Sequence, residues 1–206
     1  MKTNKITNFR RDRENHQQKL RQGILDDVSN LLVREGVNAL TMRRIAEMVG
    51  CSTTVLYTMF DNKQGLVEEL YLRGFEILRQ SLAAVSHPGN SKSYIYDLCF
   101  AYRDFAIANP TYYSIMFLKV IPEYTPNEAN LKLGQDSLEL LVQAIRDCIT
   151  GKEIEDEAWE IARTIWATVH GQVGLELMGY LNYSGVSPQQ MLKRALQALI
   201  NELFPI

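Results

Sequence analysis

The chain has 206 residues, of which 46% are hydrophobic and 22% charged, so it can bury a core as one large domain or as a small domain beside a larger one. No apolar run reaches the ~18 residues that span a bilayer, and the polar, basic N-terminus does not resemble a signal peptide, which excludes these membrane and secretory signals. The net charge of −2 is uneven: residues 1–63 carry 11 Lys and Arg against 7 Asp and Glu, so this basic third is expected to meet a polyanion.

The first third of the chain is predicted to be helical after a flexible basic arm over residues 1–14. Apolar residues follow at helical spacing, and Gly36 suits the position just after a helix C-terminus. This stripe comprises Leu20, Ile24, Leu25, Val28, Leu31 and Leu32. Thr41 is expected to cap a second helix, whose core positions are Met42, Ile45, Ala46 and Val49.

A sharp turn is predicted at Gly50, and Ser52 after it can cap a third helix of only about two turns. Val55, Leu56 and Phe60 are expected to hold this third helix against the second. Its remaining hydroxyl-bearing residues then face outward. A fourth helix begins after Asp61 or Asn62 and runs toward residue 85. Residues 41–60 therefore have the pattern of a helix-turn-helix.

The rest of the chain also reads as helix, and no segment shows sustained strand alternation. A loop is predicted over residues 86–93, and Pro110 interrupts the helices that follow. Ser187 and Pro188 form a helix start. Helices are expected over about 94–108, 111–120, 127–150, 155–183 and 188–203. The prediction is an all-α protein of about nine helices, with a three-helix N-terminal domain over residues 1–63 and a helical body over residues 64–206.

The short third helix fits a DNA major groove, where N-terminal residues meet base edges and hydroxyls reach phosphates. Arg43 and Arg44 lie on the outer side of the preceding helix, and arginine commonly reads guanine. Lys63 follows the cap of the fourth helix, where its ammonium and the positive helix end can share one phosphate. The alternative is a helical hairpin with an incidentally polar face. The predicted DNA-binding residues are Thr41, Arg43, Arg44, Thr53, Thr54, Tyr57, Thr58 and Lys63.

The segment GVNALTMRRIAEMVGCSTTVLYTMFDNKQGLVEEL, residues 36–70, resembles the DNA-binding region of the tetracycline-repressor (TetR) family of bacterial transcriptional regulators. The resemblance is carried by Thr41, Ile45, Ala46, Gly50, Ser52, Leu56, Tyr57, Phe60, Lys63 and Leu66. It implies that Arg43 and Thr53 approach bases, while Thr41, Tyr57 and Lys63 contact phosphates. Departures from the family pattern leave the operator sequence open, and they are Cys51, Thr54, Val55 and Met59.

Two fragments of the body, NPTYYSIMF at residues 109–117 and WATVHGQVGLELMG at residues 166–179, resemble a C-terminal domain of one branch of the family marked by a Trp and a His-Gly pair. The resemblance implies a dimer that binds a small molecule among the body helices, which tilts the fourth helix and moves two reading heads apart. Aromatic and methionine side chains suit flat or apolar ligands, although such residues are also ordinary core. A pocket of about 300–1,000 Å³ is expected. The predicted ligand-binding residues are Tyr102, Phe105, Tyr112, Tyr113, Met116, Phe117, Trp166 and His170, with Arg103 as a further polar candidate.

The last two helices are predicted to form a homodimer interface. Small residues at spacings of four, seven and eleven allow two helices to approach closely, and the final helix carries a broad apolar stripe. Packing of the same faces within one subunit is the alternative. The predicted interface residues are Ala167, Gly171, Gly174, Met178, Leu192, Leu196 and Leu199.

Metal-dependent and enzymatic functions are not indicated by the sequence. The three histidines are far apart, and no phosphate loop, dinucleotide fingerprint or nucleophile elbow occurs, so neither a cofactor nor a catalytic site is expected. Three scattered cysteines fit a reducing, cytoplasmic location better than a disulfide framework. The prediction is a bacterial, homodimeric, ligand-released repressor of a palindromic operator. The alternatives are a DNA-binding architectural or cell-cycle protein without a ligand, and a helical-bundle enzyme.

Overall fold

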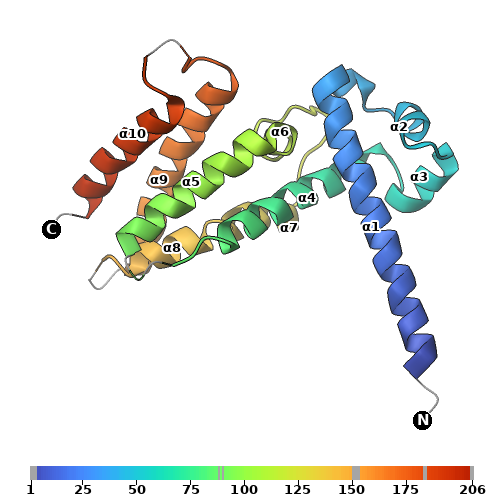
Figure 1. Ribbon diagram of the computed structural model, residues 1–206, viewed down its shortest axis with the longest axis horizontal. Helices are drawn as coiled ribbons and strands as arrows, with labels where there is room; N and C mark the ends of the chain where they lie inside the picture. Colours follow the sequence, from blue (N-terminus) through green and yellow to red (C-terminus); the bar gives the residue numbers. More distant parts are fainter. Residues whose placement is uncertain (1–3, 88, 90, 150–153, 183–184, 205–206) are drawn as a thin grey trace. The chain divides into compact units, whose positions relative to one another are not determined.

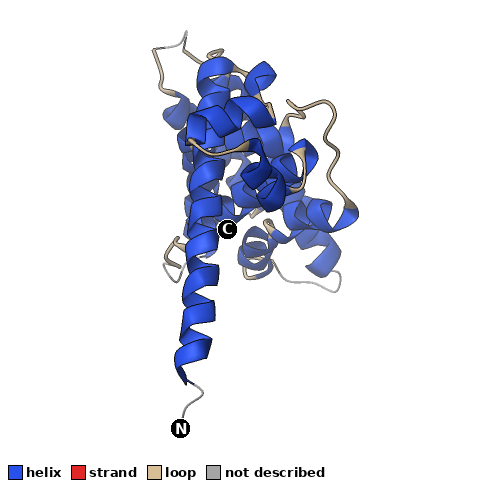
Figure 2. Cartoon of the chain, turned by 90° about the vertical axis from the view of Figure 1, so that its right-hand side faces the viewer, coloured by secondary structure: helices blue, strands red, loops and turns tan. Residues whose placement is uncertain are grey.

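The computed structural model describes residues 4–87, 89, 91–149, 154–182 and 185–204, and all regular structure in these ranges is helical (Figures 1 and 2). The predicted all-α fold is confirmed. The helices are α1 (Asn4–Glu35), η1 (Val37–Ala39), α2 (Met42–Val49), α3 (Thr53–Phe60), α4 (Lys63–Ala83), α5 (Ser91–Ala108), α6 (Pro110–Phe117), α7 (Glu128–Asp136), α8 (Glu139–Arg146), α9 (Ile154–Leu177) and α10 (Pro188–Leu203). Within the described ranges, none is both long and apolar enough to cross a membrane.

The chain divides into two compact units. The first unit comprises Met1–Gly74 and Thr111–Pro126, and the second unit comprises Phe75–Pro110 and Asn127–Ile206. This division differs from the expected boundary at residue 63, because α6 packs on the N-terminal helices. The hydroxyl of Tyr112 donates to the Asp26 carboxylate at 2.8 Å. Helix α4 crosses the boundary between the units, so it belongs to both.

The N-terminal helices follow the predicted caps closely. The Thr41 hydroxyl oxygen accepts from the Arg44 backbone N–H at 3.2 Å, and that of Ser52 accepts from Val55 at 3.3 Å. Gly50 has the left-handed φ of 71° that ends α2. Two expectations were wrong. Leu20 is 50% exposed, because the N-terminal part of α1 has no packing partner over that position, and α1 starts at Asn4, within the predicted flexible arm.

The junction between α3 and α4 depends on Gly65. A Cβ at this position would lie 2.2 Å from the carbonyl oxygen of Phe60 and 3.3 Å from its carbonyl carbon. Both are backbone atoms, which cannot rotate away as the end of a long side chain can. Asn62 caps α4 as predicted, since its side-chain oxygen accepts from the Gly65 N–H at 3.0 Å. The absence of a side chain at Gly65 therefore permits the tight turn that joins the two helices.

Arg21 ties the same junction to α1. Its guanidinium donates to the Glu69 carboxylate at 2.6 Å and to the carbonyl oxygen of Met59, and it lies 5.2 Å from the centre of the Phe60 ring. One side chain thus joins α1, the end of α3 and the start of α4. Burial raises the pKa of Glu69 although the bond from Arg21 acts in the opposite direction, so desolvation is the larger effect on this carboxylate.

The second unit is a helical bundle in which α5 packs against α8 and α9, and α9 packs against α10. Its buried side chains include Ile95, Ile145, Ile165 and Leu192. The helix predicted over residues 127–150 is divided into α7 and α8 by turns at Ser137 and Leu138. The hydroxyl of Ser137 donates to the Gly134 carbonyl at 2.7 Å, which satisfies a helix-end acceptor at the break. Ser187 and Gln190 complete a capping box at the start of α10.

Two alanine substitutions test the α3–α4 junction. Gly65→Ala should lower the free energy of unfolding by about 1–3 kcal/mol, because the new methyl group meets a backbone carbonyl. Gly23→Ala in α1 is the matched control, since a Cβ there meets nothing within 4 Å. It should instead raise the free energy of unfolding by about 0.5–1 kcal/mol through helix propensity. Urea denaturation followed by circular dichroism measures both. Equal effects at the two sites would contradict the close contact at Gly65.

Candidate nucleic-acid interface and cavity

The recognition helix α3 presents a polar face to solvent. Thr53, Thr54, Tyr57 and Thr58 are exposed, whereas Leu56 and Phe60 are buried against the rest of the first unit. Val55 is also exposed, at 44%, which corrects its predicted role in packing. It lies in the first turn of α3. The outward face therefore combines hydroxyl groups with one apolar side chain, a set that can meet phosphates and a thymine methyl group.

Thr41 lies at the start of α2, also at the surface. Its hydroxyl oxygen caps the helix by accepting a hydrogen bond from the Arg44 backbone N–H, and this bond occupies one lone pair of the oxygen. The hydroxyl hydrogen can still be donated to a phosphate oxygen. The same residue can thus cap the N-terminus of α2 and contact DNA.

The three predicted DNA-binding cations all have carboxylate partners within the first unit. Arg43 lies 3.1 Å from Glu47 one turn along α2, and its side chain is 88% exposed. Arg44 makes two bonds to Glu35, at 2.5 and 3.0 Å, and the bond from Arg44 is the largest cause of the lowered pKa of Glu35. The ammonium of Lys63 lies 2.6 Å from Glu123. Exposed pairs of this kind are weak enough to exchange for phosphates.

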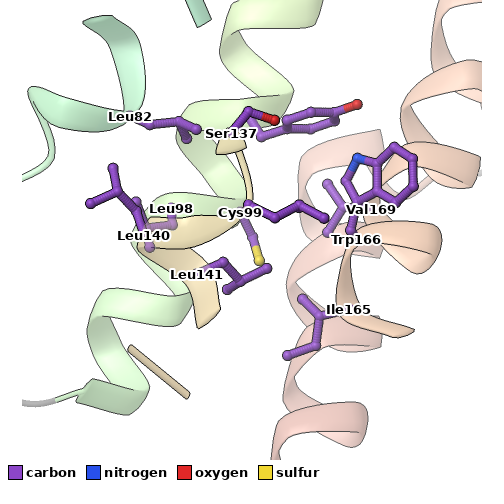
Figure 3. Close-up of a pocket in the computed structure, with 11 residues that line it drawn as sticks. Leu82, Leu98, Cys99, Ser137, Leu140, Leu141, Ile165, Trp166 and Val169 are labelled. Carbon is purple, nitrogen blue, oxygen red and sulfur yellow. The ribbon is translucent and has the colours of Figure 1, made fainter. Parts of the chain in front are cut away.

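A small cavity of about 30 Å³ lies in the second unit. Figure 3 shows side chains from α5, α8 and α9 that converge on it. Its lining is almost wholly apolar: Leu82, Leu98, Cys99, Tyr102, Ser137, Leu138, Leu140, Leu141, Ile165, Trp166 and Val169. The volume is far below the expected 300–1,000 Å³, so a ligand larger than a few atoms would have to displace side chains to enter.

Polar groups at the cavity are few and uncharged. The hydroxyl of Tyr102 lies 2.9 Å from Nδ1 of His170. Burial lowers the pKa of His170, which favours the neutral ring near pH 7. Burial also raises the pKa of the Cys99 thiol to about 12, so that thiol stays protonated. Arg103 is not part of the lining, since it pairs with Glu176 on α9 at 2.5 and 2.9 Å.

The predicted ligand residues are divided between the two units. Tyr102 and Trp166 line the cavity, and His170 contacts it through Tyr102. Phe105 is buried elsewhere in the second unit. The four residues of α6, namely Tyr112, Tyr113, Met116 and Phe117, belong to the first unit. Met116 and Phe117 line a separate cavity of about 180 Å³ beside the segment that follows α6. The aliphatic lining residues were missed, because their spacing in the sequence is that of any buried helix face.

The predicted dimer residues separate into two groups. Ala167 and Gly171 are exposed on α9, with Gly174 half-buried, and Leu175 is a further exposed residue of this helix. Met178 and Tyr180 are exposed in the turn that follows α9. Leu192 and Leu196 have no exposed area within the subunit, in which α10 packs against α9, so the subunit does not present them at its surface. Leu199 is half-buried. A Cβ at Gly171 would meet nothing within 4 Å, so nothing in the described subunit requires glycine there.

Two family models match the chain. The family described as "Bacterial regulatory proteins, tetR family" matches residues 24–70, and "Tetracyclin repressor-like, C-terminal domain" matches residues 95–199. The chain belongs to the tetracycline-repressor family. The N-terminal match contains α2, α3 and the first residues of α4, so this TetR-family regulator has a helix-turn-helix DNA-binding domain.

Among its relatives, the uncharacterized HTH-type transcriptional regulator YobS of Bacillus subtilis (strain 168) is 31% identical over 97 residues, which are 47% of this chain and 51% of YobS. The match thus spans about half of that relative's length.

Solved structures share the fold over most of the chain. Regulatory protein SCO4313 has a TM-score of 0.77 at 23% identity and covers 90% of this chain and 97% of its own. BioQ, solved with its double-stranded DNA operator, has a TM-score of 0.64 at 21% identity and covers 90% and 98%. A TetR variant from Acinetobacter baumannii AYE, solved in complex with minocycline, has a TM-score of 0.60 at 17% identity and covers 87% and 93%. At these identities the likeness is one of fold.

Proposed function

We propose that the protein is a homodimeric transcriptional repressor that binds a palindromic operator and leaves it when a neutral, apolar small molecule enters the second unit. The observation that carries this proposal is the exposed face of α3, with four hydroxyl-bearing side chains. The same unit also exposes the cations Arg43 and Lys63. In this assignment Arg43 and Thr53 contact bases. Thr41, Tyr57 and Lys63 contact phosphates, and Arg44, Thr54 and Thr58 lie at the edge of the interface.

The chemistry of the proposed effector follows from the cavity in the second unit. The lining offers aliphatic and aromatic surface, a thiol that stays protonated and a neutral histidine beside Tyr102. No charged side chain of the described residues lines it. An ion moved into such surroundings loses its hydration without a compensating partner, so a charged ligand is disfavoured. A compact, uncharged aromatic compound matches these surroundings.

Helix α4 offers a route for the response. It begins at Lys63, a proposed phosphate contact, and it carries Leu82, which lines the cavity, in its last turn. A ligand that displaces Leu82 would change the preferred position of this helix. The ligand needs no contact with the DNA-binding residues, provided that it binds more tightly to the conformation that no longer matches the groove.

The dimer is supported by the exposed small residues of α9. Glycine inside a helix costs about 0.5–1 kcal/mol relative to alanine, and the described subunit gives no packing reason for it at Gly171. Close approach of a second helix would supply one. Two subunits related by a twofold axis would also present two copies of α3 to half-sites about one helical turn apart, ~34–36 Å.

A second candidate function is an architectural DNA-binding protein without an effector. The small volume of the cavity, about 30 Å³, favours it, because a site already open to a ligand would be larger. The two candidates share the DNA interface and differ only in whether the second unit binds a small molecule.

The DNA interface is tested by two substitutions with different expected effects. Lys63→Ala should weaken binding to all sequences alike and reduce the salt slope by about one unit, because it removes one phosphate contact. Arg43→Ala should cost about 1–3 kcal/mol on the operator and relax the preference at one base pair of each half-site. Salt titrations of fluorescence anisotropy on operator and random duplexes measure both. Lys132→Ala, in α7 of the second unit, is the control for loss of one positive charge. Equal, sequence-blind losses for the first two variants would exclude Arg43 as a base reader.

The effector class is tested by tryptophan fluorescence. Trp166 lines the cavity, whereas the indole N–H of Trp159 donates to Glu155 at the surface, so Trp159→Phe leaves one reporter at the cavity. Nitrobenzene should quench that variant in a saturable way, while the isosteric anion benzoate should not bind. Trp166→Phe is the control that reports only collisional quenching of Trp159. Purely linear quenching of both variants by nitrobenzene would favour the architectural function.

The dimer is tested by Gly171→Leu. The subunit has room for this side chain, so the variant should fold and yet dissociate, shifting from dimer to monomer by at least about tenfold in dissociation constant, or about 1.4 kcal/mol. Sedimentation velocity gives the mass, and circular dichroism confirms folding. Gly23→Leu, at an equally open position in α1, should remain dimeric. A Gly171→Leu protein with an unaltered dimer would remove α9 from the interface.

A further inference from the structure

The segment that follows α6 holds Glu123 at a defined position in the first unit. Ile121 is only 2% exposed, and its carbonyl accepts from the Tyr124 N–H at 3.1 Å, which closes a turn around Glu123. The Tyr124 ring lies 5.8 Å from the ring of Tyr71 on α4. The backbone on both sides of Glu123 is therefore anchored, and its carboxylate does not extend from an unconstrained loop.

That carboxylate lies on the ammonium of Lys63. The distance is 2.6 Å, and the two side chains are 38% and 50% exposed. The hydrogen bond from Lys63 is the main cause of the lowered pKa of Glu123, which keeps this carboxyl ionised near neutral pH. Lys63 is the first residue of α4, so the positive end of the helix adds to the attraction for an anion. A carboxylate thus occupies surroundings that suit a phosphate.

The Lys63–Glu123 pair joins residues that are far apart in the sequence, unlike the ion pairs of Arg43 and Arg44. Glu47 of α2 is four residues from Arg43, and Glu35 of α1 is nine residues from Arg44. Glu123 is 60 residues from Lys63 along the chain and comes from the segment after α6. The same segment borders the cavity of about 180 Å³ that Met116 and Phe117 line.

We propose that Glu123 competes with the DNA backbone for Lys63 and so sets the affinity of the free protein for DNA of any sequence. This inference rests on the proposed role of Lys63 as a phosphate contact. To bind DNA, the protein must break the Lys63–Glu123 pair, and the released carboxylate then faces a negatively charged backbone. The result is a lower affinity that does not depend on sequence. Specific sites, which gain from base contacts, are affected by the same factor as non-specific ones, so the pair limits how much protein is held by random DNA.

The size of the effect follows from the exposure of the pair. Exposed ion pairs correspond to a factor of roughly 1.5–5 in an equilibrium constant. A dimer has two such pairs, one in each subunit, so the factor for a single pair is squared when both are removed. The expected gain in affinity is roughly 2–25-fold. The gain should be largest at low salt, because both competing interactions are screened as ionic strength rises.

The experiment measures binding of a fluorescein-labelled random-sequence duplex to the full chain by anisotropy at low salt. The variants are Glu123→Gln, Lys63→Ala and the double substitution, compared with wild type as a double-mutant cycle. Glu123→Gln keeps the size of the side chain and removes its charge. Glu128→Gln, five residues along the chain, is the control for the same charge change at a carboxylate for which no ion pair is found among the described residues.

We expect Glu123→Gln to bind more tightly than wild type by the factor given above, and Glu128→Gln to bind as wild type. In the Lys63→Ala background, the gain from Glu123→Gln should be clearly smaller, because no Lys63–Glu123 pair has to be broken and only the repulsion between the carboxylate and the DNA backbone is relieved. An equal gain in both backgrounds would show a general charge effect and overturn the inference, as would no gain in the wild-type background. Wild type that binds no duplex at all would overturn the proposed function itself, and is distinguished from these outcomes by the first titration.

Discussion

The contact between Gly65 and the backbone carbonyl of Phe60 is the constraint on which the DNA-binding unit depends. It brings the end of α3 against the start of α4 without room for even a methyl group. Since α4 then leads into the second unit, the direction in which α3 faces is fixed relative to the helix that would transmit a signal. Arg21 strengthens the same junction from α1 by bonding Glu69 and the carbonyl of Met59. The recognition helix is short, yet it is held from two sides.

Local features were predictable from the sequence because they depend on neighbouring residues only. The caps at Thr41, Ser52, Asn62 and Ser187 each follow from a side-chain oxygen three residues ahead of a backbone N–H. The turn at Gly50 follows from the conformational freedom of glycine. These signals, together with helical periodicity, were enough for the fold class and for the outward face of α3.

Features set by distant partners were not predictable in the same way. Leu20 and Val55 have the spacing of core residues but lack a helix above them, whereas Leu192 and Leu196 are covered by α9 within the subunit. The break between α7 and α8 was not predictable from a proline, because the sequence has none there. The cavity lining is mostly aliphatic and so resembles ordinary core, and its position follows from how four helices meet, namely α4, α5, α8 and α9. The roles of Gly65 and Arg21 were not predicted, because they depend on contacts in the folded chain and not on a sequence motif.

The burial of Cys99 has a kinetic consequence. Cys99 lines the cavity and is fully buried as a protonated thiol, while Cys51 and Cys148 are only half-buried. A thiol reagent can reach Cys99 only during the moments when the surrounding helices separate. Its rate of modification therefore records how often the second unit opens, with the two other cysteines as an internal reference for ordinary accessibility. A compound that fills the cavity would slow the modification of Cys99 alone. The modification rate of this thiol therefore reports the rate of the motion that admits a ligand.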